Sequence, residues 1–288
     1  MNRLSDIGTI KSILSRHGFS FSKALGQNFL VNPDVCPRMA DLCGAGDDVG
    51  VIEVGPGIGV LTAELAQRAE KVISIELDKR LLPVLDETLA EYKNVKIIND
   101  DIMKIDLLKL IEDEFSGMDV VVCANLPYYI TSPVIMKLLE EKLPIKAITV
   151  MVQKEAADRI CAPVGSRESG AVTVSVNYYA EAKTLFKVSA GSFMPPPKVD
   201  SAVIRLDIRP EPPVGVDDEA IMFSLIKAAF AQRRKTLVNS VSNMMHIDKG
   251  SLIKILDDAG INANVRAEEL NLEQLALIAN GIASLSIR

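Results

Sequence analysis

The fold is decided by one stretch of the chain, Val51-Ile-Glu-Val-Gly-Pro-Gly-Ile-Gly59. Its first residues, apart from Glu53, have the apolar composition of a buried strand, and helical spacing follows the stretch. The glycines between them allow the backbone to turn tightly and to approach a ligand without interference from a Cβ atom. The stretch therefore predicts a strand, a ligand-binding turn and a helix. A turn that only joins strand to helix is the competing interpretation.

On both sides of this stretch, apolar runs alternate with amphipathic segments. The runs typical of buried strands are Val49–Val54, Val72–Ile75, Val95–Ile98, Val120–Cys123 and Ile145–Val152. The segments with helical spacing are Val60–Arg68, Lys79–Tyr92, Ile105–Glu114 and Ser132–Lys142. This alternation predicts an α/β fold, in which right-handed crossovers place helices on both faces of a parallel sheet. We expect three β-branched segments to extend the sheet in the antiparallel sense, namely Ala171–Tyr179, Ala182–Val188 and Val199–Ile208.

The composition changes at Arg209-Pro-Glu-Pro-Pro-Val-Gly215, where the prolines disfavour helix and strand and indicate a linker. Beyond it the apolar spacing is helical in Glu219–Ala231, Arg234–Met244, Gly250–Ala259 and Leu272–Leu285, and Gly260 is a helix stop signal. We therefore expect a catalytic α/β domain over residues 1–208, with an N-terminal arm at 1–30, and a small all-α domain over residues 209–288.

Composition narrows the class of protein. No apolar run reaches the roughly 20 residues that span a bilayer, and no apolar signal segment opens the chain. The four cysteines form no C-x-x-C pair and only two histidines are present, so we expect reduced thiols, no metal site and a cytoplasmic protein. The net charge of −6 gives no overall attraction to a polyanion, so nucleic-acid binding requires local clusters of Lys and Arg.

Carboxylates follow the next two predicted strands and indicate a nucleotide-type cofactor. Glu76 comes 21 residues after Gly55, where a carboxylate accepts hydrogen bonds from both hydroxyls of a ribose; Asp78 is the near alternative. After the following strand we expect Asp101, in preference to Asp100, to accept the amino group of the cofactor's adenine, although paired aspartates are also ordinary turn formers. Gly55 and Gly57 would form the turn at this site.

The fourth predicted strand ends in Asn125-Leu126-Pro127-Tyr128. The amino group of a purine is a poor nucleophile because its lone pair is delocalised into the ring. If both its hydrogens are accepted, by the Asn125 carbonyl and a backbone carbonyl held rigid by Pro127, the nitrogen becomes pyramidal and its lone pair faces the methyl group. Tyr128 offers a flat surface for the base, and such stacking contributes about 1–3 kcal/mol. Alone, the motif would be read as a turn after a strand.

Together these residues resemble the motifs of the class I methyltransferases that make N6-methylated adenine. Upstream, Leu25-Gly-Gln-Asn-Phe-Leu30 resembles a segment of the ribosomal RNA adenine dimethyltransferases. The resemblance implies S-adenosyl-L-methionine as methyl donor and assigns cofactor contacts to Asn28 and Leu30, beside Gly55, Glu76, Asp101 and Asn125. It also implies a Rossmann-like domain with a mostly parallel seven-stranded sheet and a small C-terminal all-α domain.

Two further stretches resemble the small-subunit members of that family, Phe193-Met-Pro-Pro-Pro-Lys-Val-Asp-Ser-Ala-Val203 and Phe230-Ala-Gln-Arg-Arg-Lys-Thr-Leu237. The resemblance places Phe193 opposite Tyr128, so that the two rings sandwich an adenine flipped out of its stack. It implies dimethylation of N6 of two adjacent adenosines in the 3′-terminal hairpin loop of 16S ribosomal RNA. One departure is visible, because Tyr129 stands where several members have Asn; we expect an effect on packing or rate and none on reaction type.

The expected partner is 16S ribosomal RNA within the immature small subunit, bound by a monomer. Basic residues are candidates for phosphate contact: Arg233, Arg234 and Lys235, with Lys11, Arg16 and Lys23 near the N-terminus. A short basic run is otherwise a solvated helix face.

Three other functions compete with this one. They are a resistance methylase acting on 23S ribosomal RNA, a nicotinamide dehydrogenase sharing the glycine-rich turn, and a non-catalytic subunit assembly factor that retains the fold. The stretches at 193–203 and 230–237 argue against the first, and the Asn125 motif is unexplained by the second. Intact glycines, Glu76 and Asn125 weigh against the third.

Overall fold

The computed structural model describes residues 3–19 and 28–285. The chain forms two compact units, one of residues 1–157 and 182–208, the other of residues 158–181 and 209–288. The division at 208/209 coincides with the limit expected from the sequence, whereas residues 158–181, expected in the first domain, pack with the second unit. Among the described residues no helix is long and apolar enough to cross a membrane.

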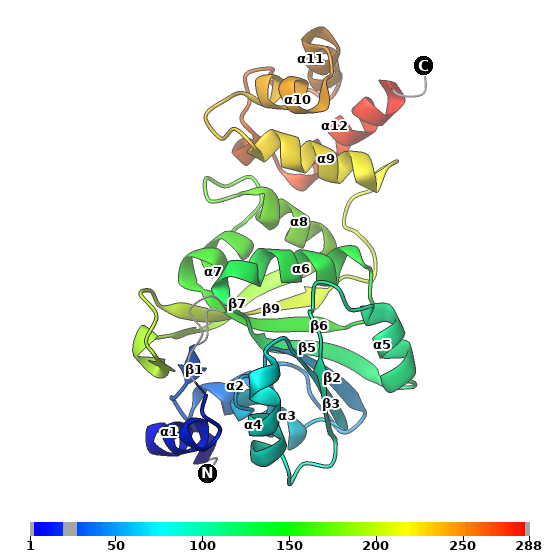
Figure 1. Cartoon of the computed structure of the whole chain (residues 1–288). Coiled ribbons are helices and arrows are strands. Elements are labelled where there is room, and N and C mark those ends of the chain that lie inside the picture. The colour runs from blue at the N-terminus through cyan, green and yellow to red at the C-terminus, as the bar shows by residue number, and fades with distance from the viewer. Residues whose placement is uncertain (1–2, 20–27, 286–288) are drawn as a thin grey trace. The chain divides into compact units, whose positions relative to one another are not determined.

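The first unit is built on a seven-stranded sheet (Figure 1). Its order is β4 (Val95–Asn99), β3 (Lys71–Glu76), β2 (Val49–Val54), β5 (Asp119–Asn125), β6 (Ala147–Gln153), β9 (Ser201–Ile208) and β7 (Ala180–Val188). The first five strands are parallel, and β9 is antiparallel to β6. The predicted class I arrangement is therefore confirmed, including the five parallel strands and the extension by 182–188 and 199–208.

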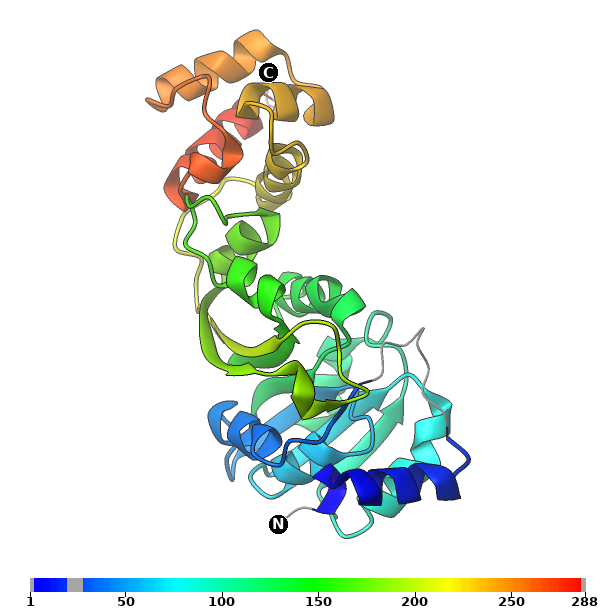
Figure 2. The same cartoon turned by 90° about the vertical axis from the view of Figure 1, so that its left-hand side faces the viewer.

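Helices cover both faces of this sheet (Figures 1 and 2). The helices of this unit are α1 (Ile7–Arg16), α2 (Val35–Leu42), α3 (Val60–Ala66), α4 (Leu82–Thr88), α5 (Leu107–Glu114) and α6 (Thr131–Glu140). Helix α7 (Lys154–Ile160) begins in this unit and ends in the second. Short 3₁₀ turns lie at η1 (Arg3–Ser5), η2 (Lys79–Leu81), η3 (Tyr128–Ile130) and η4 (Ala190–Ser192). Because β2, β3, β5 and β6 are buried at successive positions, their residues face covered surfaces on both sides, as parallel sheets require.

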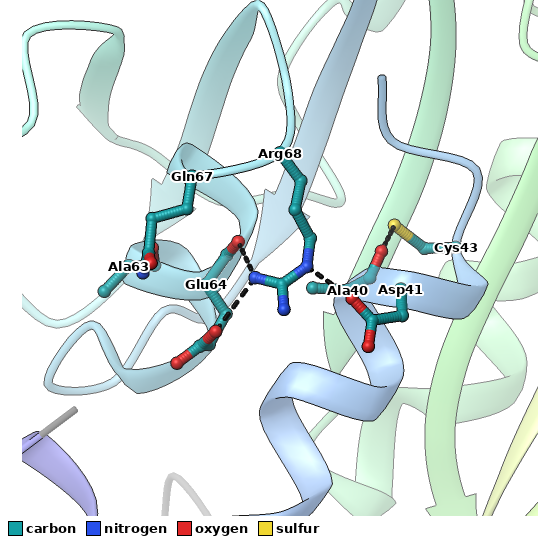
Figure 3. Close-up of polar contacts among 7 residues, drawn as sticks. All are labelled: Ala40, Asp41, Cys43, Ala63, Glu64, Gln67 and Arg68. Atoms are coloured by element: carbon teal, nitrogen blue, oxygen red, sulfur yellow. Dashed lines mark hydrogen bonds and ion pairs between the residues drawn. The ribbon is translucent and has the colours of Figure 1, made fainter. Parts of the chain in front are cut away.

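Arg68, just after α3, joins that helix to α2 (Figure 3). Its Nε donates to Asp41 Oδ1 at 2.6 Å, and its Nη1 donates to the Glu64 carbonyl oxygen at 2.8 Å and to Glu64 Oε2 at 2.9 Å. One guanidinium thus fixes the end of α2 against the helix that follows the glycine-rich turn.

Packing inside the sheet explains one glycine in a strand. A Cβ atom on Gly50 would lie 2.1 Å from the Phe115 ring, so only glycine fits beneath that ring. Next to it, Lys71 donates to Glu114 at 2.8 Å and Lys96 forms a second ion pair with the same carboxylate. Hydrogen bonding by these two lysines lowers the pKa of Glu114 to about 2.

A two-stranded antiparallel sheet also belongs to the first unit. Strand β1 (Phe29–Leu30) pairs with β8 (Phe193–Met194), with Leu30 opposite Phe193 and Phe29 opposite Met194. The Ser192 carbonyl accepts from the backbone N–H of Val31 at 2.8 Å. Segments separated by most of the unit are therefore held side by side.

The expected strand Ala171–Tyr179 is wrong, because this segment forms the helix α8 in the second unit. Thr173 Oγ1 accepts from the Gly170 N–H at 2.9 Å and donates to the Arg159 carbonyl at 2.7 Å, which fixes the first turn. Side chains at the successive positions 173–176 are all buried. The alternation of a half-buried strand is absent from that burial pattern, so tertiary packing overrides the β-branched composition.

The rest of the second unit is helical, as predicted. Its helices are α9 (Glu219–Phe230), α10 (Leu237–Met245), α11 (Lys249–Asp258) and α12 (Leu272–Leu285), with η5 (Ala267–Glu269). Gly260 stops α11 at a φ of 68°, as expected. Tyr178, which is buried, and Tyr179 pack with Phe223, so they contribute to the core. Burial and the nearby Glu219 carboxylate raise the pKa of Tyr178 to about 12.

Candidate active site

A pocket of about 280 Å³ lies in the first unit, where β2, β3 and β5 end and where β4 leads into the next turn. Parallel sheets place their ligands at this carboxyl edge. The pocket is lined by all the predicted cofactor-binding and catalytic residues: Asn28, Leu30, Gly55, Gly57, Glu76, Asp101, Asn125, Leu126, Pro127, Tyr128 and Phe193. One cavity therefore gathers motifs that are widely separated in the sequence.

The glycine-rich turn has the conformation that its composition predicts. Gly55, Gly57 and Gly59 have φ values of 69°, 62° and 89°, in the left-handed region that favours glycine. A Cβ on Gly55 would point into open space beside the pocket, whereas one on Gly57 would lie 3.3 Å from the Phe29 ring. The turn thus exposes its backbone to the pocket and packs closely on β1.

The carboxylate of Glu76 is oriented by its own loop. Its Oε1 accepts from the Asp78 N–H at 2.7 Å. Burial raises the pKa of Glu76 to about 7, and the negative charge of Asp78 adds to this effect. Hydrogen bonds from the backbone, of which that of Asp78 is the largest, oppose it. Asp78, the alternative ribose acceptor, instead holds Arg80 through two hydrogen bonds of 2.8 and 2.6 Å. Of these two carboxylates, Glu76 lines the pocket and Asp78 does not.

A second buried carboxylate, Glu53, lies at the end of β2. Only 1% of it is exposed, and its Oε2 accepts from the hydroxyls of Thr62 and Ser74, each at 2.6 Å. Burial raises the pKa of Glu53 to about 7, the two hydroxyls oppose this, and the charge of Glu76 adds to it. The end of the pocket beneath the glycine-rich turn is thus acidic.

Asp100 and Asp101 both line the pocket, and they differ in burial and in their hydrogen bonds. Asp100 is exposed and its Oδ1 accepts from the Asp101 N–H at 2.7 Å, so it caps the turn. Asp101 is half-buried, and its Oδ1 accepts from the Met103 N–H at 3.0 Å. Lys104 lies 3.8 Å from Asp101 Oδ2. This arrangement orients the Asp101 carboxylate at the pocket wall.

The Asn125 motif leads from β5 into η3. No hydrogen bond among residues 3–19 and 28–285 engages the side chain of Asn125, which leaves its amide available to a ligand. Leu126 is buried and fixes the chain as it leaves the sheet. The Tyr128 hydroxyl lies 2.7 Å from Ser201 Oγ, which fixes the outer end of the ring. Burial raises the pKa of Tyr128.

Sequence reasoning missed several side chains of this pocket. Leu77 and Met103, which follow the two carboxylate positions, line the pocket and are 51% and 39% exposed. Tyr129, which the sequence marked only as a departure from the family motif, also lines the pocket next to Tyr128 and is 55% exposed. The signal available in the sequence was an apolar residue one or two positions after each of the carboxylates Glu76 and Asp101. Cys36 also lines the pocket, and no motif marks it.

The candidate RNA-binding residues differ in what they contact. Arg233 donates to the Arg167 carbonyl at 2.8 Å and lies 3.3 Å from Glu268, so it holds parts of the second unit together. Arg234 and Lys235 are exposed, and their side chains make no hydrogen bond or ion pair within the described part of the chain. Lys23 lies outside the described residues.

Comparison with known proteins identifies the family to which this chain is similar. The family model described as ribosomal RNA adenine dimethylase matches residues 18–284. The chain is 48% identical over 286 residues to the ribosomal RNA small subunit methyltransferase A of Bacillus mycoides (strain KBAB4), covering 97% of this chain and 98% of that protein. The enzyme of the same name from Bacillus anthracis (strain A0248) matches with the same identity and coverage.

Two solved structures share the fold over most of the chain. A dimethyladenosine transferase from Plasmodium falciparum superposes with a TM-score of 0.73 and 26% identity, covering 87% of this chain and 95% of that one. The 23S rRNA methyltransferase ErmE superposes with a TM-score of 0.67 and 28% identity, covering 89% and 100%. The chain therefore belongs to the ribosomal RNA adenine dimethylase family, as the resemblance of its motifs implied, and is an S-adenosylmethionine-dependent RNA methyltransferase.

Proposed function

We propose that this enzyme dimethylates N6 of two adjacent adenosines in the 3′-terminal hairpin loop of 16S ribosomal RNA, acting as a monomer on the immature small subunit in the cytoplasm. The observation that carries the proposal is the shared pocket, in which carboxylates suited to an adenosine meet the Asn125 motif and Phe193. Small-subunit specificity is supported by the 48% identity to enzymes named for that subunit.

The pocket residues fit the methyl donor. S-Adenosylmethionine supplies a methyl group on a positively charged sulfur. Glu76 would accept the ribose hydroxyls, Asp101 would accept the adenine amino group, and Gly55 and Gly57 would admit the ligand to the backbone. Asn28 and Leu30, before and on β1, would close the pocket from the N-terminal side.

The target adenine would enter beside Asn125. The Asn125 side-chain carbonyl and the Leu126 backbone carbonyl would each accept one N6 hydrogen, leaving the lone pair directed at the methyl group. Tyr128 and Phe193 would stack on the two faces of the flipped base. Attack by N6 would form the N–C bond as the C–S bond of the donor breaks, with S-adenosylhomocysteine as the leaving group. The positive charge passes to the nitrogen, which then loses a proton to water, so no side chain is needed as a strong base. A second donor molecule would methylate the same nitrogen, whose one remaining hydrogen is accepted in the same way.

Methylation of purified subunits tests this function. The enzyme is incubated with labelled S-adenosylmethionine and either unmethylated small subunits or 23S ribosomal RNA, and the RNA is digested to nucleosides. We expect labelled N6,N6-dimethyladenosine from small subunits alone. Label on 23S RNA alone would instead identify a large-subunit methylase, the activity named for ErmE. No label on either, despite cofactor binding, would favour an assembly role.

A further inference from the structure

One contact of the proposed base site comes from outside the Asn125 motif. Ser201 is the first residue of β9, and none of it is exposed. Its Oγ lies 2.7 Å from the hydroxyl of Tyr128, the ring proposed to stack on the adenine. A fully buried serine therefore holds the outer end of a half-buried tyrosine that lines the pocket.

Ser201 is itself fixed by the sheet and by the loop that precedes it. It pairs with Gln153 at the end of β6. The neighbouring Asp200 accepts the Lys154 N–H on its backbone carbonyl and the Ala190 N–H on Oδ1, each at 2.9 Å. These contacts fix the backbone at Ser201, so its side chain starts from a fixed point beside the ring.

The same segment carries the other proposed face of the base site. Phe193 lies in β8, and the chain runs from β8 directly through 195–200 to Ser201. Tyr128 comes from a different part of the sheet, after β5. The hydroxyl pair thus links the element that holds one ring to the segment that holds the other.

We propose that Ser201 is a positioning residue for the target base, which fixes the Tyr128 ring at the angle and spacing needed to stack an adenine against Phe193. The inference rests on the proposed function and deepens it. A tyrosine hydroxyl is protonated at neutral pH, and burial raises the pKa of Tyr128 further, so the hydroxyl is available for this bond. The consequence is kinetic: a base held loosely after its first methylation leaves before the second, so the monomethylated nucleoside accumulates.

The test compares Ser201→Ala, Tyr128→Phe and the double variant on unmethylated small subunits. Each single change removes the bond from one side and keeps the ring. Ser240→Ala is the matched control, because Ser240 is also fully buried and donates one hydrogen bond, to the Ala228 carbonyl at 2.6 Å, within the second unit. For each variant we would measure kcat, KM for subunits, the Kd of S-adenosylhomocysteine, the melting temperature and the ratio of mono- to dimethylated adenosine.

We expect Ser201→Ala and Tyr128→Phe each to lower kcat about three- to tenfold, the effect of losing one neutral hydrogen bond, and to raise the monomethyl fraction. The double variant should be no worse than either single variant, because all three lack the same bond. Ser201→Thr, which keeps a hydroxyl, should restore the product ratio. The Kd of S-adenosylhomocysteine should stay unchanged, and Ser240→Ala should match the wild type in product ratio.

A product ratio and kcat of Ser201→Ala equal to those of Ser240→Ala would overturn the inference, as would single effects that multiply in the double variant. Failure of the proposed function is separate, because it would show as no dimethyladenosine from the wild-type enzyme on small subunits.

Discussion

Leu30 lies directly opposite Phe193 in the two-residue pairing of β1 with β8. Leu30 belongs to the proposed cofactor site and Phe193 to the proposed base site, and both side chains are buried. The backbone N–H groups of Val31 and Asn32 both donate to the Ser192 carbonyl, so the contact between the two segments continues past the paired residues. An element that orders one site therefore also orders the other, which predicts energetic coupling between the cofactor and RNA.

This coupling predicts that bound S-adenosylhomocysteine tightens RNA binding, and that Asn32→Ala weakens the effect. Asn32 Nδ2 donates to Ser192 Oγ at 3.2 Å, and losing such a bond costs about 0.5–1.5 kcal/mol, roughly a two- to tenfold loss of coupling. The measurement is the Kd for RNA with and without S-adenosylhomocysteine. Asn239→Ala, which removes an exposed bond to Thr236 of 2.8 Å, is the control and should leave the ratio unchanged. A wild-type RNA Kd that S-adenosylhomocysteine leaves unchanged would contradict the coupling, and an Asn32→Ala ratio equal to that of the wild type would contradict the role of Asn32.

Asn125→Ala separates catalysis from binding. The side chain has no partner in the described part of the chain, so its loss should leave folding intact, while removal of an acceptor for the N6 hydrogen should lower kcat by about 10²–10³. Cofactor Kd and subunit binding should change less than about fivefold, below the 1 kcal/mol typical of a lost contact. Single-turnover methylation measures the loss of catalysis, and pelleting with small subunits measures subunit binding. Unchanged kcat would remove Asn125 from the proposed mechanism.

Most of the sheet was predictable because its signals are local. Buried strands such as Val49–Val54 are continuous apolar runs, and a parallel sheet brings their carboxyl ends together, so Glu76 and Asn125 were expected at one edge before any contact was known. The glycine-rich turn likewise requires positive φ values that its residues permit.

The features that the sequence did not predict depend on contacts between segments that are distant in the chain. Ala171–Tyr179 has a strand's composition, yet the bond of Thr173 to Arg159 and burial at successive positions select a helix. The bond between Tyr128 and Ser201 joins residues 73 positions apart, and neither residue type marks it. For the same reason the packing of 158–181 with the second unit was not foreseen.

The exposed side chains of Arg234 and Lys235 can be tested as phosphate contacts by the salt dependence of RNA binding. Arg234→Ala with Lys235→Ala should weaken RNA binding and reduce the slope of log K against log salt by about 2, one unit per lost phosphate contact. Arg233→Ala should instead lower the melting temperature, because Arg233 bonds to Arg167 and pairs with Glu268. Binding titrations over a range of salt concentrations measure the slope. An unchanged slope in the double variant would place the RNA elsewhere.

Tyr129→Asn tests the departure from the family motif. Because 55% of Tyr129 is exposed, the change should alter stability by no more than about 0.5 kcal/mol. The loss of an aromatic surface beside Tyr128 should lower kcat/KM for subunits by up to about tenfold, and N6,N6-dimethyladenosine should remain the product. Tyr129→Phe keeps the ring and should match the wild type. A different methylated nucleoside from Tyr129→Asn would show that this position determines the reaction type.

Cofactor affinity should depend on pH through Glu76. Burial raises the pKa of Glu76 from 4.5 to about 7 in the folded, unliganded protein. Ribose hydroxyls that donate to the carboxylate favour its ionised form, so binding lowers that pKa and releases a proton at and below pH 7. The bound state then holds fewer protons, and affinity for S-adenosylhomocysteine should rise as pH increases towards 7 and level off above it.

Stability of the unliganded protein should change in the opposite direction over this window. Between pH 4.5 and about 7 the unfolded chain has already lost the Glu76 and Glu53 protons, whereas the folded protein retains them. Raising the pH therefore favours unfolding until the folded groups also ionise, and this contribution to the free energy of unfolding falls to a plateau above about 7.

Calorimetry in two buffers of different ionisation enthalpy measures both the affinity and the released proton. Glu76→Gln should weaken binding at neutral pH and flatten the pH profile, and Glu53→Gln shows how much of the profile belongs to the neighbouring carboxylate. Glu114→Gln is the control, because Lys71 and Lys96 lower the pKa of Glu114 to about 2 and it stays ionised throughout. A profile that persists in both Glu76→Gln and Glu53→Gln would show that neither carboxylate releases the proton, and the proposed role of Glu76 at the ribose would then be wrong.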